Sequence, residues 1–150
     1  MLKLITAFAL AAIATATVGA SQENEVMAPV RQFVSGFNQG DAKMAQAACV
    51  DQTLIIDDFP PHAWRGKGAT SNWLRDYAGY AKKNGISDGF IILGQARHID
   101  VTGRDAYVVI PTKFSLKKNG QSVKETGLMT LALRKGTDGW RVTAWSWADI

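Results

Sequence analysis

The sequence has little of what disulfide or metal chemistry requires. Cys49 is its one cysteine, and its two histidines, His62 and His98, lie far apart along the chain. One thiol cannot form an internal disulfide. Neither CxxC nor HExxH spacing occurs, so we expect no metal site and no cofactor. Cys49 stands among small apolar residues whose pattern predicts a buried helix, where a thiol packs as an apolar group.

Charge of one sign is also not concentrated anywhere. The 17 basic and 13 acidic residues give a formal net charge of +4, and the basic ones are scattered, with three adjacent pairs, Lys82-Lys83, Lys117-Lys118 and Arg134-Lys135. No basic stripe alternates with aromatic residues, so nucleic acid is not an expected partner. The net positive charge slightly favours the approach of an anionic ligand. The 47% hydrophobic and 20% charged residues are typical of a globular domain, and after residue 20 no repeat or linker divides the chain.

The N-terminal residues have the pattern of a secretory signal peptide. Lys3 gives a basic start, residues 4–18 carry no charge, and Val18-Gly19-Ala20 places small or compact residues before Ser21, as a signal peptidase site requires. An uncleaved membrane anchor is the alternative for a charge-free run of this length, but its many Ala and Thr residues favour cleavage. We expect a signal peptide at residues 1–20, a single domain at 21–150, a periplasmic or secreted location, and no membrane attachment after cleavage.

Three helices are predicted from the hydrophobic spacing. Apolar residues share one face of a helix over residues 23–37, which Asn38-Gln39-Gly40 ends. Asp41 is a predicted N-cap for a second helix reaching about Val50. A short strand is predicted over residues 53–57. The third helix is predicted from about Gly68 to Lys83, with Gly85 stopping it.

Strand patterns follow Gly85. Long strands are predicted over residues 90–101, 106–116, 122–134 and 140–147, separated by turn residues. Short turns between neighbouring strands indicate an antiparallel meander. The order α-α-β-α-β-β-β-β predicts an α+β fold, with three helices packed on one side of a strongly curved, mostly antiparallel sheet.

Four motifs, in this order and spacing, carry a resemblance that covers nearly all of residues 21–150. They are Phe33-Val34-Ser35-Gly36-Phe37-Asn38-Gln39-Gly40-Asp41, Ile56-Asp57-Asp58, Trp64-Arg65-Gly66 and Gly139-Trp140-Arg141-Val142. The chain resembles the nuclear transport factor 2-like superfamily, within it the SnoaL-like and ketosteroid-isomerase-like proteins. The resemblance implies a cone-shaped α+β barrel with a deep cavity between helices and sheet, and a homodimer through the outer face of the sheet.

The resemblance also allows one reaction to be tested against the residues. Ketosteroid isomerases place a general-base Asp after the first strand, a Tyr in the first helix and a protonated Asp on a late strand. Asp57 falls at the base position, but the tyrosine position holds Phe33 and the late acid falls near Thr130-Leu131. A base without these donors lacks an enolate-stabilising site, and one such donor contributes about 3–4 kcal/mol. We therefore reject that reaction for this chain.

The candidate catalytic residues lie where the first predicted strand turns. Asp57 and Asp58 end an apolar run, Pro60-Pro61 stiffens the turn, and His62 follows. Strand alternation places the two acids on opposite faces, so only one faces the cavity unless the turn has already begun. The register of Gly66 favours Asp57. The alternative is that either acid caps the turn or pairs with Arg65. A buried acid beside aromatic rings would have a raised pKa suited to a general base, and His62 could assist proton transfer or simply hold the turn.

Aromatic residues supply candidate ligand-binding positions. Trp73, Tyr77 and Tyr80 share one face of the third predicted helix, and Trp145 and Trp147 share one face of the last strand, with Val142 and Ala144 on the other. An apolar outer face would suit a partner subunit. The candidates are Trp64, Trp73, Tyr77, Tyr80, His98, Tyr107, Trp145 and Trp147. Core packing is the alternative for the aromatic rings, and a plain position on the sheet surface is the alternative for His98.

Two functions from different classes follow. The first is an exported domain that binds a small, largely apolar molecule in its cavity, with acid/base chemistry of the isomerase, hydratase or hydrolase type at Asp57. The second is a non-catalytic interaction or dimerisation module whose cavity is filled by its own side chains. An open cavity with an acid and His62 facing one common point favours the first. A plugged cavity favours the second.

Overall fold

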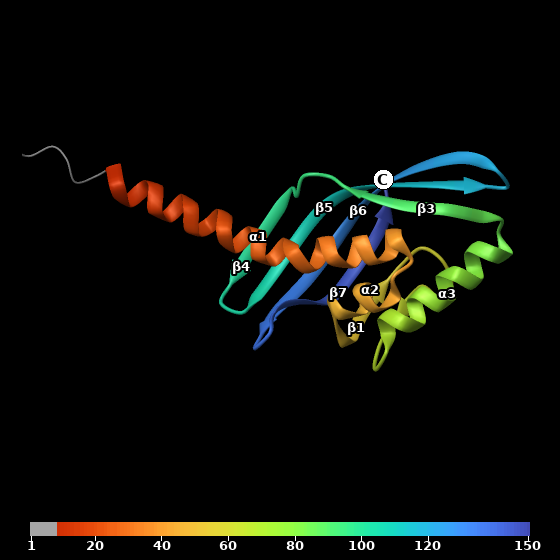
Figure 1. The fold of residues 1–150 in the computed structure, drawn as a ribbon, viewed down its shortest axis with the longest axis horizontal. Coiled ribbons are helices and arrows are strands. Elements are labelled where there is room, and N and C mark those ends of the chain that lie inside the picture. The colour runs from red at the N-terminus through yellow and green to blue at the C-terminus, as the bar shows by residue number, and fades with distance from the viewer. Residues whose placement is uncertain (1–8) are drawn as a thin grey trace, which may run out of the picture.

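The computed structural model describes the backbone of residues 9–150 and the side chains of residues 19–150. Within this range the chain forms three helices and a mixed sheet of seven strands (Figure 1). The elements in order are α1 Ala9–Gln39, α2 Ala42–Ala47, β1 Cys49–Ile56, β2 Ala63–Trp64, α3 Ala69–Lys83, β3 Ile86–Leu93, β4 His98–Thr102, β5 Asp105–Lys118, β6 Gln121–Gly136 and β7 Gly139–Asp149. The predicted α+β class is confirmed.

Helix α1 buries the face that its periodicity predicts. Val26, Val30 and Phe33 are fully buried against the sheet, and the first turns of the helix extend beyond the sheet edge (Figure 1). The helix ends in a pair of bonds typical of a glycine stop: Gly40 N–H donates to Phe37 O and Asp41 N–H to Gly36 O. Asp41 then caps α2, its Oδ1 accepting from Met44 N–H at 2.9 Å.

The N-terminal prediction falls partly outside the described residues. Residues 1–8 of the expected signal peptide are not described, and its remaining residues form the start of α1. In residues 9–150 no helix has the length and hydropathy that crossing a membrane requires. Cleavage after Ala20 stays a prediction.

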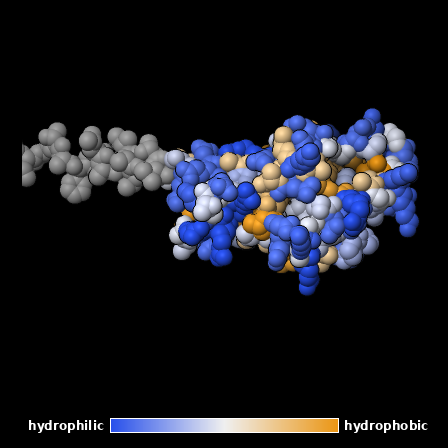
Figure 2. All heavy atoms as spheres, turned by 60° about the horizontal axis from the view of Figure 1, so that its bottom comes forward, coloured by the Kyte–Doolittle hydropathy of each residue, from blue (hydrophilic) through white to orange (hydrophobic). Residues whose placement is uncertain are grey.

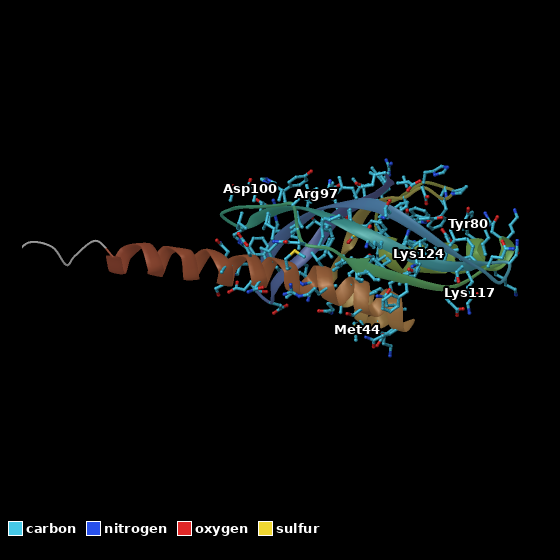
Figure 3. The ribbon with its side chains drawn as sticks, turned by 90° about the horizontal axis from the view of Figure 1, so that it is seen from above. Met44, Tyr80, Arg97, Asp100, Lys117 and Lys124 are labelled. Carbon is cyan, nitrogen blue, oxygen red and sulfur yellow. The ribbon has the colours of Figure 1, made fainter. Side chains whose placement is uncertain are left out.

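The sheet has the strand order β2-β1-β7-β6-β5-β3, with β4 also paired to β5. Strands β5, β6 and β7 form the predicted antiparallel meander, whereas β1 pairs with β7 in parallel. The strong curvature expected of the sheet stays a prediction. One face is covered by the helices, as the view from above shows for α1 (Figure 3). Contacts of Trp73 on α3 with Phe37 on α1 and Trp145 on β7 place α3 on the same face.

Two predicted element boundaries are wrong. Cys49 is buried, but it begins strand β1 rather than ending a helix, because α2 stops at Ala47. The predicted strand over residues 90–101 is two strands, β3 and β4, that pair with successive parts of β5. The break lies opposite Pro111, whose carbonyl accepts from Gly94 N–H at 2.8 Å. Proline has no amide hydrogen for the sheet, so a break in pairing at this point is expected.

A β-bulge in β7 overturns the predicted division of that strand's faces. The register shifts between the pairs Ala132–Ala144 and Leu133–Val142, which leaves Thr143 as the extra residue. Val142 therefore lies on the same inner face as Trp145, and both are buried. Ala144 lies on the outer face, paired with Leu54 of β1.

The buried side chains form one core between the helices and the inner face of the sheet. The surface around it is mostly hydrophilic, and hydrophobic residues show near the middle of the face drawn in Figure 2. One end of this core is not completely filled. The aromatic residues of α1, α3 and β7 meet there, and the candidate site lies among them.

Candidate functional site

A cavity of about 140 Å³ lies between α1, α3 and the inner face of the sheet. An enclosed water needs roughly 10–15 Å³ by this measure, so the cavity has room for on the order of ten waters or one small molecule. It is therefore open rather than filled by its own side chains. Its lining is Phe33, Phe37, Asp57, Asp58, Phe59, Trp73, Tyr77, Tyr80, Ile86, Ile91, Thr112, Phe114, Leu116, Lys118, Glu125, Met129, Trp145 and Trp147.

Asp57 is the buried acid of this cavity. It is 9% exposed, and it is the one charged residue among the buried residues of 19–150. Trp73 Nε1 donates to its Oδ2 at 2.8 Å, and the backbone N–H of Asp58 donates to its Oδ1 at 2.9 Å. Each carboxylate oxygen thus has a donor, which fixes the orientation of the group.

Burial raises the pKa of Asp57 from 3.8 to about 6. Loss of hydration disfavours the carboxylate most, and the charge of Asp58 adds to this effect. The bonds from Trp73 and from the Asp58 amide act in the opposite direction and keep the pKa from rising further. Asp57 can therefore gain or lose a proton close to neutral pH, as a general base requires.

Asp58 also lines the cavity, although it is exposed to solvent. Only one acid was expected to face inward unless the turn had already begun at these residues. Strand β1 ends at Ile56, so the alternation of faces no longer applies. Asp57 lies deep and Asp58 lies nearer the solvent.

His62 does not join the two acids. It is exposed, is absent from the cavity lining, and has a φ of 71° in the turn after the Pro60–Pro61 pair. Its ring Nδ1 lies 3.3 Å from the backbone carbonyl oxygen of Asp57, and its backbone N–H donates to Phe59 O. The arrangement that would have favoured catalysis, an acid and the His62 imidazole facing one common point, is therefore not present. His62 holds the turn.

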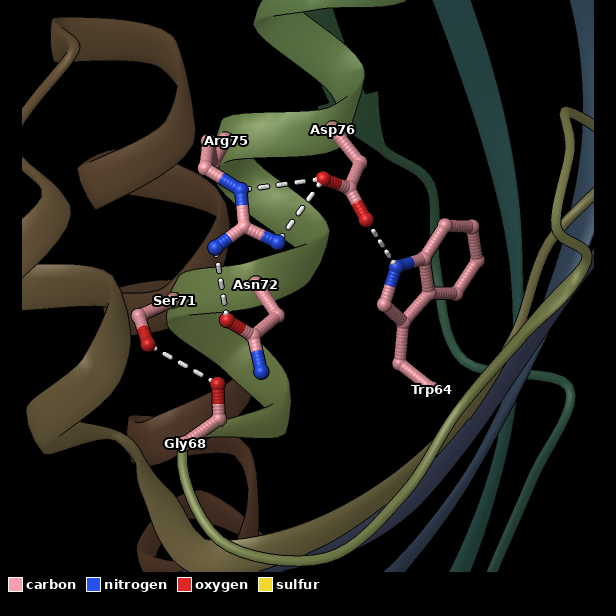
Figure 4. Close-up of polar contacts among 6 residues, drawn as sticks. All are labelled: Trp64, Gly68, Ser71, Asn72, Arg75 and Asp76. Atoms are coloured by element: carbon pink, nitrogen blue, oxygen red, sulfur yellow. Dashed lines mark hydrogen bonds and ion pairs between the residues drawn. The ribbon is translucent and has the colours of Figure 1, made fainter.

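Trp64 supports the cavity from behind. Its indole Nε1 donates to Asp76 Oδ2 on α3 at 2.9 Å, and Arg75 binds the other oxygen of Asp76 (Figure 4). The bond from Trp64 is the main reason that the pKa of Asp76 is lowered. The Trp64 ring packs against Phe59 at 4.9 Å between centroids. Trp64 is thus a wall-supporting residue and not part of the lining.

The aromatic face of α3 points into the cavity. Trp73 is buried, and Tyr77 and Tyr80 are half-buried beside Phe59. Burial raises the pKa of Tyr77 to about 12, with the charges of Asp57 and Glu125 adding to the shift. Tyr77 is therefore a neutral hydroxyl at physiological pH.

Trp145 and Trp147 line the cavity from the sheet side. Trp147 Nε1 donates to Thr112 Oγ1 at 2.9 Å, while Trp145 Nε1 is buried without a partner among the described residues. The Trp147 ring lies over Gly127, where a Cβ atom would come within 2.2 Å of it. Only glycine leaves that space on β6.

His98 and Tyr107 are not in the cavity. Both are exposed on the outer face of the sheet, with ring centroids 6.1 Å apart. Tyr107 neighbours the fully buried Val108, and successive residues of a strand face opposite sides. Neither residue contributes to the site described here.

Several lining residues were not predicted, chiefly four phenylalanines and one acid: Phe33, Phe37, Phe59, Phe114 and Glu125. Glu125 pairs with Phe114 across β5 and β6 and so shares its inner face. Burial raises its pKa, and the charge of Asp58 adds to this. Which face of the sheet Glu125 occupies depends on the strand register, and the sequence alone does not specify that register.

Among residues 19–150 no group of three or more His, Cys, Asp or Glu residues could hold a metal ion.

The two positions that hold oxyanion donors in ketosteroid isomerases present no such donor to this cavity. Phe33 is fully buried and lines the cavity with a ring that has no hydroxyl. Leu131 is buried on the inner face, and Thr130 bonds to Ser146 instead. The cavity thus holds a buried carboxyl group but lacks, at these two positions, the oxyanion donors of that reaction.

Solved structures provide the comparison with known proteins, since no family model and no curated relative matches. A nuclear transport factor 2-like superfamily protein from Salmonella enterica aligns at 18% identity over 87% of this chain and 92% of its own, with a TM-score of 0.72. An NTF2-like protein with a cystatin-like fold from Novosphingobium aromaticivorans has 15% identity, coverage of 97% and 92%, and a TM-score of 0.73. A ketosteroid isomerase-like protein from Erwinia carotovora has 16% identity, coverage of 85% and 95%, and a TM-score of 0.68. The structural neighbours are thus nuclear transport factor 2-like and ketosteroid isomerase-like proteins, and this chain has their fold.

Proposed function

We propose that the cavity binds a small, largely apolar molecule and that Asp57 is the proton acceptor of a reaction on it. One observation carries the proposal: a single buried carboxyl group, held by two N–H donors, stands in the wall of an open aromatic cavity. Apolar walls with a few placed polar groups are typical of small-molecule sites.

In the proposed reaction Asp57 takes a proton from the bound molecule or from a water beside it. The indole of Trp73 keeps the carboxylate oriented, since it bonds to Oδ2 from α3. The pKa near 6 leaves the group mostly ionised at neutral pH and still basic enough to accept a proton. Isomerase, hydratase and hydrolase chemistry all begin with such a step. The fold hosts several chemistries, so the reaction class rests on the site and not on the fold.

Deuterium exchange tests this proposal without knowledge of the substrate. A library of small carbonyl compounds is incubated in D₂O with the protein, and proton NMR follows loss of the acidic C–H signal. We expect at least one compound to exchange faster with the wild type than with Asp57→Asn. A library whose members bind, as thermal shift shows, but whose exchange is equal in both proteins would overturn proton removal from carbon by Asp57.

We further propose a homodimer through the outer face of the sheet. Large apolar side chains are exposed there, among them Ile56 on β1 at 51% and Tyr107 on β5 at 46%. Ala144, Ser146 and Thr130 between them are small, which allows a second sheet to approach closely. Sedimentation should give a dimer for the wild type and for the control Ala47→Lys on exposed α2, and a monomer for Ile56→Lys. A monomeric wild type contradicts this proposal.

We also propose export to the periplasm or the medium. The charge-free N-terminal segment and the small residues before Ser21 support it. N-terminal sequencing of the protein from its native host should then begin at Ser21. A mature protein that begins at Met1 contradicts export with cleavage.

A further inference from the structure

The charges around the cavity are opposite in sign to those of the whole chain. The chain has a formal net charge of +4. The charged residues of the lining are Asp57, Asp58, Glu125 and Lys118, an excess of two negative charges when all are ionised. Asp58 and Glu125 act on each other electrostatically, and Glu125 also acts on Tyr77. The cavity therefore has a negative potential, which does not suit the anionic ligand that the net charge favoured.

Aromatic rings surround the same space on several sides. Nine rings line the cavity: Phe33, Phe37, Phe59, Trp73, Tyr77, Tyr80, Phe114, Trp145 and Trp147. Some neighbouring rings meet at steep angles, 60° for Phe37 with Tyr77 and 90° for Trp73 with Trp145, whereas Trp73 and Tyr77 stack at 22°. Rings set at steep angles form walls around a space. The π faces of aromatic rings attract cations, and Trp does so most strongly.

Two indole donors of the lining are already bonded, whereas the Trp145 indole and the hydroxyls of Tyr77 and Tyr80 remain as donors. The indole N–H of Trp73 already bonds to Asp57, and that of Trp147 already bonds to Thr112. Lys118 is exposed. Figure 3 shows the strands that carry Lys117 and Lys124 reaching the end of the molecule where Tyr80 lies. Besides the Trp145 indole and the two hydroxyls, the deep part of the cavity offers ring faces and carboxylate oxygens, which together suit a positively charged group.

We infer that the molecule bound in this cavity carries an organic ammonium group, a protonated amine or a quaternary ammonium. The inference rests on the proposed function only in that the cavity binds a small molecule. The ammonium lies among the rings of Trp73, Tyr77 and Trp145, with Asp57 and Glu125 balancing its charge.

Choline and 3,3-dimethylbutan-1-ol provide the test, because they have the same shape. Choline carries a positively charged nitrogen where the alcohol has a neutral carbon atom. Calorimetric titration of the wild type should show choline binding about ten-fold more tightly or better, within the range measured for desolvated cation–π contacts. Equal or tighter binding of the neutral alcohol overturns the inference and leaves the small-molecule cavity intact. Absence of binding by both at high concentration overturns the inference and counts against the cavity as well.

Charge variants separate recognition of the cation from general attraction. Glu125→Gln and Asp58→Asn should each weaken choline several-fold and leave the neutral alcohol unchanged, and Lys118→Gln should strengthen choline. Asp100→Asn is the matched control, because Asp100 is exposed on β4, far from Tyr80 (Figure 3). An equal loss of choline affinity in Asp100→Asn and in Glu125→Gln would show a non-specific effect and contradict the inference.

Discussion

Trp73 Nε1 donates a hydrogen bond of 2.8 Å to Asp57 Oδ2, joining α3 to the turn after β1. This bond crosses the wall of the cavity and fixes the direction of its deepest charge. A second indole, Trp64, makes a similar bond to Asp76 at 2.9 Å, but on the far side of the wall. The Trp64–Asp76 pair therefore serves as a control for the Trp73–Asp57 pair, since only the latter faces the cavity.

Trp73→Phe should raise the pKa of Asp57 above about 6, because the lost bond stabilises the carboxylate. The unfolding free energy should fall by about 1.5–3 kcal/mol, the usual contribution of a hydrogen bond to a charged group. Trp64→Phe is the control. It should raise the pKa of Asp76 and leave that of Asp57 unchanged. Carbon-detected NMR titration of both carboxyl groups measures this, and an unmoved Asp57 in Trp73→Phe would contradict it.

Asp57→Asn should change how stability depends on pH. In the folded chain Asp57 binds its proton more tightly than in the unfolded chain, so the protonated group stabilises the fold at low pH. That contribution is complete below about pH 4 and is lost as pH rises through 6. Relative to Asp57→Asn, the wild type should therefore lose about 2–3 kcal/mol between pH 4 and pH 6, at 1.4 kcal/mol for each pKa unit.

The change of unfolding free energy with pH is a better readout of Asp57 than the unfolding free energy at any one pH. An asparagine at position 57 places an NH₂ group against either the Trp73 indole or the Asp58 amide, and both of these are donors. The variant therefore loses one hydrogen bond, which adds the same offset to its stability at every pH. Denaturant unfolding at several pH values gives both quantities. Parallel pH profiles for the two proteins would show that Asp57 is not buried as described.

Gly127→Ala should disturb the cavity and destabilise the fold. The added Cβ would meet the Trp147 ring at 2.2 Å, so the indole must leave its place and its bond to Thr112. Overpacking of this kind costs about 1–3 kcal/mol. Gly79→Ala on α3 is the control, because nothing lies within 4 Å of its added Cβ, and it should stabilise the helix by roughly 0.5–1 kcal/mol. Thermal unfolding measures both, and a Gly127→Ala variant as stable as the wild type contradicts the packing described.

Cys49 should be unreactive in the folded protein. It is buried at the start of β1, and burial raises the pKa of its thiol to about 11. Only the thiolate is nucleophilic. An aromatic disulfide reagent at pH 8 should react at a rate set by unfolding, and rapidly once denaturant is added. Fast reaction in native buffer would show that the strand opens locally.

The helices and hairpins could be predicted because each depends on local sequence. The buried stripe of Val26, Val30 and Phe33 has helical spacing, and the glycine stop and aspartate cap at residues 40–41 are local signals. The position of Asp57 was favoured by its distance from Gly66. The side chain that orients it, Trp73, lies 16 residues away, and such a pairing depends on how α3 packs.

The rest depended on register, which a single sequence does not specify. One extra residue at Thr143 reverses the face of every residue before it on β7, and this places Val142 inside with Trp145. Glu125 enters the cavity because it pairs with Phe114. His62 had two open roles, assisting proton transfer or holding the turn, and its exposed position with a φ of 71° agrees with the second.

The pKa of Asp57 in the wild-type protein is the most direct test of a buried acid in the wall of an open cavity. Carbon-detected NMR of its side-chain carboxyl, assigned through Asp57→Asn, measures it. We expect a titration midpoint close to 6. A midpoint at the ordinary value of 3.8 would place this carboxyl in water and contradict the site.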